Sequence, residues 1–168
     1  MEIVNRVANS PLITLNLEDY YVPGERIVFD LKELLYMEQI LREKDFRESI
    51  QATDWTKYKD KHVALYCSVD AIVPVWAYML ITSRLEPYAQ TIVQGDLSVL
   101  ENALFTKSLD RIVPTEYQDK KVVVKGCGDK TVPVSAFTEI TRRLRPFVSS
   151  ISYGEPCSTV PVYKRAKA

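Results

Sequence analysis

An internal duplication constrains this chain more than any other feature of its sequence. Residues 60–96 align with residues 119–155 without a gap, at an offset of 59, and 15 of the 37 aligned positions are identical. Ordinary residue frequencies would give about two or three identities by chance. The offset is longer than the period of most solenoid repeats and occurs once, so it indicates two copies of one supersecondary unit.

Each copy is predicted to fold as strand, helix, strand. Short apolar runs predict the first strands at 62–67 and 121–126, and the second strands follow at 90–93 and 149–153. A helix is expected to begin near Pro74 and Pro133, because first-turn amides need no partner, and its apolar side chains recur at every fourth position. A helical crossover predicts that the two strands of each copy are parallel.

The remaining segments predict a single α/β domain with one mostly parallel, mixed sheet. Apolar runs at 12–17 and 26–31 indicate two N-terminal strands, either a hairpin or edge strands, and helices are expected at 38–52 and 97–109. The basic end of the chain is expected to be frayed. The predicted segments are N-terminal strands and a helix (1–59), the first repeat (60–96), a connecting helix and loop (97–118), the second repeat (119–155), and a cysteine loop with a basic tail (156–168).

Charge and composition exclude several classes of partner. The 22 basic residues balance the 22 acidic residues, so we expect no dedicated nucleic-acid binding. The sequence shows no signal peptide and no apolar run long enough to span a membrane, so we expect no membrane association and a cytoplasmic location. A protein partner is compatible with the sequence, which leaves the oligomeric state open. The odd number of cysteines, three, favours reduced thiols over a disulfide framework.

The three cysteines are the strongest candidate site. Cys67 ends a predicted strand, Cys127 lies just past the matching strand, and Cys157 follows the last strand by a few residues. All three should therefore lie near the edge where the parallel strands end. Thiolates bind soft metals, and three of them with one open position suit zinc or an iron–sulfur cluster. The residues predicted to complete or support that set are Asp70, Asp129 and Glu155.

Two other functions fit the same residues. The chain is predicted alternatively to be a thiol-dependent enzyme or sulfur carrier that uses Cys157, whose loop Pro156 and Pro161 would stiffen. It is also compatible with an interaction module in which the cysteines are inert. In that reading, Asp70 and Asp129 cap helices. The only histidine, His62, lies five residues before Cys67 and should point to the other face of the sheet.

Four segments resemble an uncharacterised bacterial family, domain of unknown function 2480. They are Cys-Ser-Val-Asp-Ala-Ile-Val-Pro at 67–74, Lys-Gly-Cys at 125–127, Gly-Glu-Pro-Cys-Ser-Thr-Val-Pro at 154–161 and Ile-Leu-Arg-Glu-Lys-Asp-Phe-Arg at 40–47. The resemblance covers nearly the whole chain and implies no established activity or substrate. It suggests a link to sulfur-mobilising iron–sulfur assembly, which favours a metal or thiol role. We therefore expect an accessory protein with a three-cysteine metal site, whose enzymatic character stays open.

Overall fold

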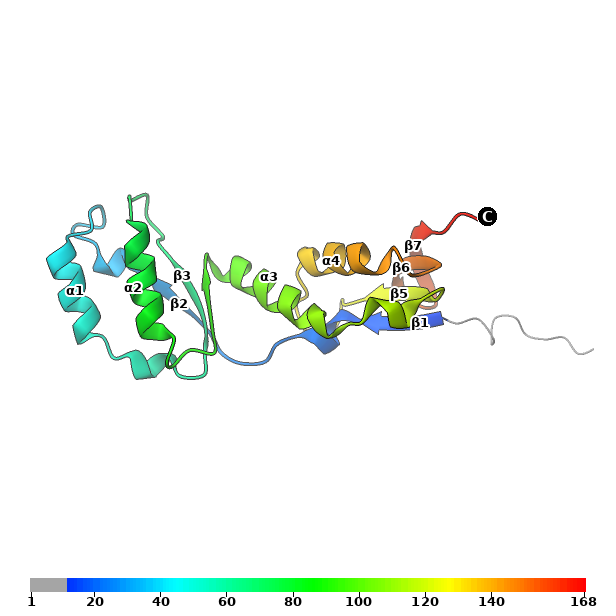
Figure 1. Cartoon of the computed structure of the whole chain (residues 1–168), viewed down its shortest axis with the longest axis horizontal. Coiled ribbons are helices and arrows are strands. Elements are labelled where there is room, and N and C mark those ends of the chain that lie inside the picture. The colour runs from blue at the N-terminus through cyan, green and yellow to red at the C-terminus, as the bar shows by residue number, and fades with distance from the viewer. Residues whose placement is uncertain (1–11) are drawn as a thin grey trace, which may run out of the picture. The chain divides into compact units, whose positions relative to one another are not determined.

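A computed structural model describes residues 12–168, and Figure 1 shows the chain. The chain divides into two compact units: unit 1 contains residues 12–22 and 104–168, and unit 2 contains Pro23–Ala103. Each unit has its own parallel strands, its own crossover helix and its own hydrophobic core. The expected α/β class with mixed strand directions is confirmed.

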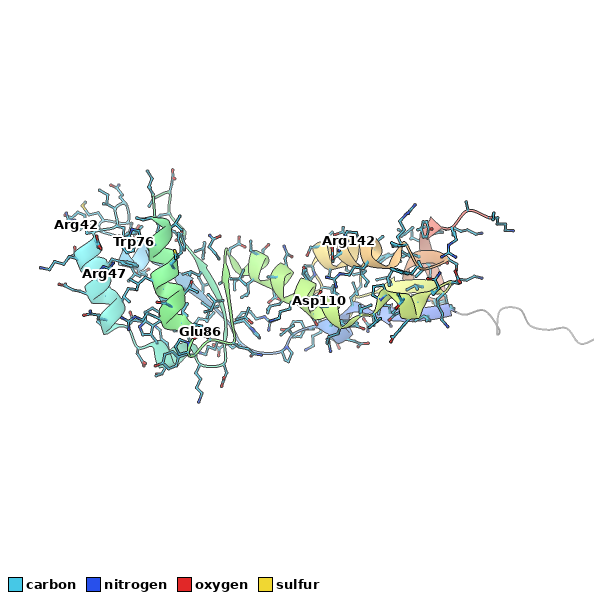
Figure 2. The ribbon with its side chains drawn as sticks, in the orientation of Figure 1. Arg42, Arg47, Trp76, Glu86, Asp110 and Arg142 are labelled. Atoms are coloured by element: carbon cyan, nitrogen blue, oxygen red, sulfur yellow. The ribbon has the colours of Figure 1, made fainter. Side chains whose placement is uncertain are left out.

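Unit 2 is built on a three-stranded parallel sheet. Its strands pair in the order β2 (Arg26–Asp30), β3 (His62–Tyr66), β4 (Thr91–Gln94). The helix α2 (Val75–Leu85) connects β3 to β4, as the duplication predicts, and α1 (Glu43–Ala52) packs beside α2. Arg47 of α1 lies over the ring of Trp76 on α2 at 5.3 Å, and the two side chains are labelled in Figure 2.

The core of unit 2 explains the sequence pattern of its elements. Val63 and Leu65 of β3 alternate onto the α2 side of the sheet. They meet Ala77, Ile81 and Leu85, the apolar stripe of α2, all fully buried. His62 is buried as well, and its ring nitrogens contact Thr91 Oγ1 at 3.0 Å and the Pro23 carbonyl at 2.8 Å.

Unit 1 is built on a four-stranded sheet. Its strands pair in the order β1 (Leu12–Asn16), β5 (Lys121–Lys125), β6 (Ser150–Glu155), β7 (Ser158–Lys164). β1, β5 and β6 are parallel, and β7 returns antiparallel to β6. The helix α4 (Val134–Leu144) connects β5 to β6 and lies over them in Figure 1. The helix α3 (Leu97–Ser108) begins in unit 2 and ends in unit 1.

An ion-pair network supports α4 from its polar side. Glu139 accepts hydrogen bonds from Arg142 and Arg143, which lower its pKa to about 2, and Arg143 also pairs with Asp110 at 2.8 Å. Figure 2 labels Arg142 and Asp110. The buried side of α4 carries Ala136, Ile140 and Leu144, which pack on Val122 and Ile151 of the sheet.

The duplication is confirmed, and it extends beyond the aligned segments. A short 3-10 turn precedes the central strand in both units, η3 (Trp55–Tyr58) in unit 2 and η5 (Pro114–Tyr117) in unit 1, at the same offset of 59. Asp60 and Asp119 then share a φ of 60°. The first strands match too, because β1 and β2 are each followed by a 3-10 turn, η1 (Leu17–Tyr20) and η2 (Leu31–Leu34).

Several expectations need correction. The two repeats do not share one sheet, because β1 joins the second repeat whereas β2 joins the first. Of the two alternatives for the N-terminal strands, edge strands are confirmed and the hairpin is wrong. The helix expected at 38–52 begins at Glu43. The chain end is not frayed up to residue 165: β7 runs to Lys164, and Arg165 pairs with Asp119 and donates to the Phe147 carbonyl at 2.7 Å.

Candidate functional site

The residues of the predicted metal site fall in both units. Cys67 and Asp70 belong to unit 2, whereas unit 1 contains Cys127, Asp129, Glu155 and Cys157. All three cysteines are free thiols. Within residues 12–168, no three histidine, cysteine or acidic side chains form a group that could hold a metal ion. The zinc or iron–sulfur centre thus stays a prediction, which elemental analysis of anaerobically purified protein tests.

Cys67 is part of a structured loop in unit 2. The half-buried thiol donates to the Val69 carbonyl at 3.5 Å, and the amide of Ser68 donates to Asp30 Oδ1 at 3.1 Å. Burial would raise the pKa of Asp30, but hydrogen bonds from Ser68 and the amide of Lys32 outweigh it and hold that pKa below 3.8. This loop is therefore fixed by its own hydrogen bonds, while Asp70 remains exposed.

Unit 1 contains a pocket beside Cys127. The pocket has a volume of about 500 Å³ and lies between α4 and the strands β6 and β7. Its walls are mostly apolar; they are formed by Val124, Cys127, Val132, Val134, Phe137, Thr141, Ile151, Ser152, Tyr153 and Val162. Such a volume and lining are typical of sites that bind small molecules.

A thiol and a phenol meet at this pocket. The Cys127 Sγ lies 2.6 Å from the Tyr153 Oη, within hydrogen-bond distance. The ring of Phe137 packs edge-on against the ring of Tyr153, with centroids 5.7 Å apart, so the phenol is held in place from the α4 side. The hydrogen bond with Cys127, together with the negative charge of its thiolate form, raises the pKa of Tyr153 above 10.0. The phenol therefore stays protonated and can donate to a thiolate.

Glycines in the loop after β5 position Cys127. Gly126 is buried, and a Cβ there would come within 2.9 Å of the Phe137 ring, so a larger residue would force this ring to shift. A Cβ added at Gly128 would likewise clash with the carboxylate of Glu18. That carboxylate accepts a hydrogen bond from the amide of Lys130. The loop is thereby fixed at both ends of the Cys127 segment.

The other predicted residues of unit 1 lie around this loop. Glu155 forms an ion pair with Lys125 at 3.4 Å. Asp129 is exposed in the loop, and Cys157 is exposed in the turn between β6 and β7. The structure brings Cys127 together with Tyr153, a residue that the sequence analysis did not single out.

A signal for Tyr153 was present in the duplication. At the offset of 59, Cys127 aligns with Ser68 and Tyr153 aligns with Gln94, so the first copy has neither group of the pair. Cys127 follows β5, and Tyr153 is the last residue of β6 that pairs with β5. Because the two strands are parallel neighbours, this placement predicts that the two side chains lie close together. The thiol–phenol pair is thus a feature of one copy and not of the shared framework.

Comparisons with known proteins identify a family but no characterised relative. The model of the family described as "protein of unknown function (DUF2480)" matches residues 1–165. No curated protein and no solved structure matches the chain. Across residues 12–168, no helix combines the length and hydropathy needed to cross a membrane.

Proposed function

The chain belongs to the DUF2480 family, and we propose that its unit 1 binds a small, largely apolar molecule and presents the Cys127 thiol to it. The observation that carries this proposal is the 2.6 Å contact between the thiol and the Tyr153 phenol at a pocket of about 500 Å³. The family assignment itself supplies no activity. The proposal therefore depends on the geometry of unit 1.

The pocket supplies the binding energy of the proposed ligand. Val134 and Val162 expose 78% and 53% of their surface, so a ligand placed between them would remove apolar area from water. Each square ångström of such area contributes about 25 cal/mol. The apolar part of the ligand is therefore expected to bind against α4 and β7.

The thiol–phenol pair supplies the chemistry. A thiolate is the nucleophilic form of cysteine, and a hydrogen bond from the protonated Tyr153 would stabilise it. This supports a thiol-dependent role, as an enzyme or as a carrier, and it favours Cys127 over Cys157 because Cys127 lines the pocket. We place the protein in the cytoplasm, where the three free thiols would stay reduced.

Protection from alkylation tests this function. The fluorophore N-phenyl-1-naphthylamine, which is uncharged and apolar, should bind the pocket and slow the reaction of Cys127 with iodoacetamide, while Cys157 reacts at its usual rate. Mass spectrometry of the peptides measures both rates in one sample. Y153F removes the phenol, so alkylation of Cys127 should slow by about threefold to tenfold.

A matched pair of variants locates the fluorophore. Val134 and Val75 occupy the same position in the two repeats and are 78% and 75% exposed. V134W should fill the pocket and abolish fluorophore binding, whereas V75W should leave binding unchanged. A fluorophore that protects Cys127 no better than Cys157, or that binds V134W as tightly as the original chain, would refute the proposed pocket function.

A further inference from the structure

A second pocket of unit 1 is lined by several basic residues. It has a volume of about 470 Å³ and its lining includes the start of β5, the start of β6 and the chain that follows β7. Four basic side chains line it: Lys121, Lys164, Arg165 and Lys167. We propose that this pocket binds a phosphorylated small molecule. The proposal rests on other residues than the Cys127 pocket and goes beyond it.

The sheet register places two lysines on either side of a serine. Lys121 of β5 is the cross-strand partner of Ser150 on β6, and Ser150 is in turn the partner of Lys164 on β7. Neighbouring strands lie about 4.8 Å apart, so the two lysines flank the hydroxyl across about 10 Å. An anion above Ser150 would accept from both ammonium groups and from the hydroxyl.

These three side chains lie on the face of the sheet opposite to α4. Their chain neighbours Val122 and Ile151 are buried in the core against α4, and side chains alternate along a strand. Lys121 and Ser150 therefore point to the other face. The row Lys121, Ser150, Lys164 thus forms one continuous polar surface within the basic pocket.

The charge of the pocket is not compensated. Within residues 12–168, Lys121, Lys164 and Lys167 form no ion pair, whereas Arg165 pairs with Asp119. Unpaired ammonium groups around one pocket repel one another, and a doubly charged anion bound there would relieve that repulsion. A phosphate group carries close to two negative charges at neutral pH, which makes it a better match than a carboxylate.

The first repeat has different residues at the positions that match Lys121 and Ser150. At the offset of 59, Lys121 aligns with His62 and Ser150 with Thr91. In unit 2 these two side chains are joined by a hydrogen bond of 3.0 Å, His62 is fully buried, and β4 is an edge strand without a counterpart of β7. The basic row is therefore specific to unit 1, like the thiol–phenol pair.

The size of the pocket indicates the rest of the ligand. A volume of about 470 Å³ is far more than one phosphate group needs, and Pro161 and Ala166 provide apolar wall beside the basic groups. The ligand is therefore expected to be a phosphate ester with an organic part, rather than the inorganic ion alone.

Pyrophosphate is the test ligand, followed by NMR of the ¹⁵N-labelled full chain. Pyrophosphate should shift the amide signals of Lys121, Ser150 and Ser152 in a saturable way. K121Q/K164Q should weaken its binding by about tenfold or more, since each lost contact is charge-assisted. K44Q/K59Q removes the same charge from exposed positions of unit 2 and should change binding by less than about twofold.

Three outcomes would overturn the proposal. They are no saturable shift at about 10 mM pyrophosphate, equal weakening in both double variants, and tighter binding of a single-stranded oligonucleotide than of pyrophosphate. Both double variants change exposed side chains, and their NMR spectra show directly whether the fold is intact. Cys127 in K121Q/K164Q should be alkylated at its original rate, because the two lysines lie outside the Cys127 pocket. Failure of the phosphate-binding proposal is therefore distinguishable from failure of the function proposed for the Cys127 pocket.

Discussion

At the scale of single residues, the function proposed for unit 1 depends on a contact between two groups that titrate. Cys127 and Tyr153 share a hydrogen bond of 2.6 Å, and both are exposed enough to reach solvent. Removing Cys127 should therefore change the titration of Tyr153, which makes the contact measurable without any ligand.

C127A should lower the pKa of Tyr153 toward 10.0. The hydrogen bond with Cys127 and the negative charge of its thiolate both disfavour the phenolate, so their loss makes the phenol easier to ionise. NMR of ¹³C-labelled tyrosine over a pH titration measures this pKa residue by residue. C157A is the control, and an unchanged Tyr153 titration in C127A would contradict the contact.

Sequence reasoning reached one residue of this pair. Cys127 stands out because cysteines are few and because it follows a predicted strand, whereas Tyr153 is one of ten tyrosines and is marked only by its place at the end of a predicted strand. The grouping of Cys67 with Cys127 assumed one shared sheet. Because β1 and β2 divide the strands between two sheets, the two cysteines belong to different units.

At the scale of elements, Asp30 connects two segments of unit 2. Its carboxylate accepts from the amide of Lys32 at 3.0 Å, which caps η2, and from the amide of Ser68 at 3.1 Å, which holds the loop after β3. The matching residue before η1 in unit 1 is Asn16, which accepts from the amide of Glu18 at 3.1 Å. An amide at this position therefore caps the turn without titrating.

D30A should lower the free energy of unfolding by about 1–2 kcal/mol at pH 7, the usual effect of losing a cap. The pKa of Asp30 is lower in the folded chain than 3.8, so its stabilisation is present above that value and is lost as the pH falls through the folded pKa. D30N should retain most of the cap but lose this part of the acid dependence. Urea unfolding at pH 7 and at acidic pH measures both effects, and equal acid dependence in D30N and the original chain would contradict the assignment.

The helices and strands were largely predictable from the sequence, whereas the pairing of the N-terminal strands with the two repeats was not. The strands, the helices α2, α3 and α4, and the parallel pairing within each repeat follow from local periodicity and from the crossover. β1 pairs with β5, and β2 pairs with β3. Because β1 and β2 have similar apolar patterns, their local sequences do not determine which partner each strand takes, and long-range packing decides it. β7 was missed since its residues are mostly exposed and Pro161 argues against a strand, although an edge strand tolerates proline.

At the scale of the whole molecule, residues 12–168 contain two hydrophobic cores that share no residue. One includes Ile81 of α2 and the other includes Ile140 of α4, and these isoleucines occupy the same position in the two repeats. Both are fully buried. Each core is completed within its own unit, so we expect each unit to respond mainly to substitutions in its own core.

Ile81→Ala and Ile140→Ala test this expectation as a matched pair. Each removes buried methyl groups and should destabilise its own unit by about 2–5 kcal/mol. Both tryptophans, Trp55 and Trp76, belong to unit 2, so tryptophan fluorescence during urea unfolding reports on unit 2. Ile81→Ala should shift the fluorescence transition, whereas Ile140→Ala should leave it within about 0.5 kcal/mol, as is usual for residues that share no packing partners.

Hydrogen exchange read by mass spectrometry supplies the reciprocal measurement for unit 1. Peptides from β5 and β6 should lose protection in Ile140→Ala and keep it in Ile81→Ala, because their amides pair within the sheet of unit 1. If the two variants instead shift fluorescence and exchange to the same extent, the units unfold as one cooperative body. The separate cores would then be parts of a single folding unit, despite the division of the strands between two sheets.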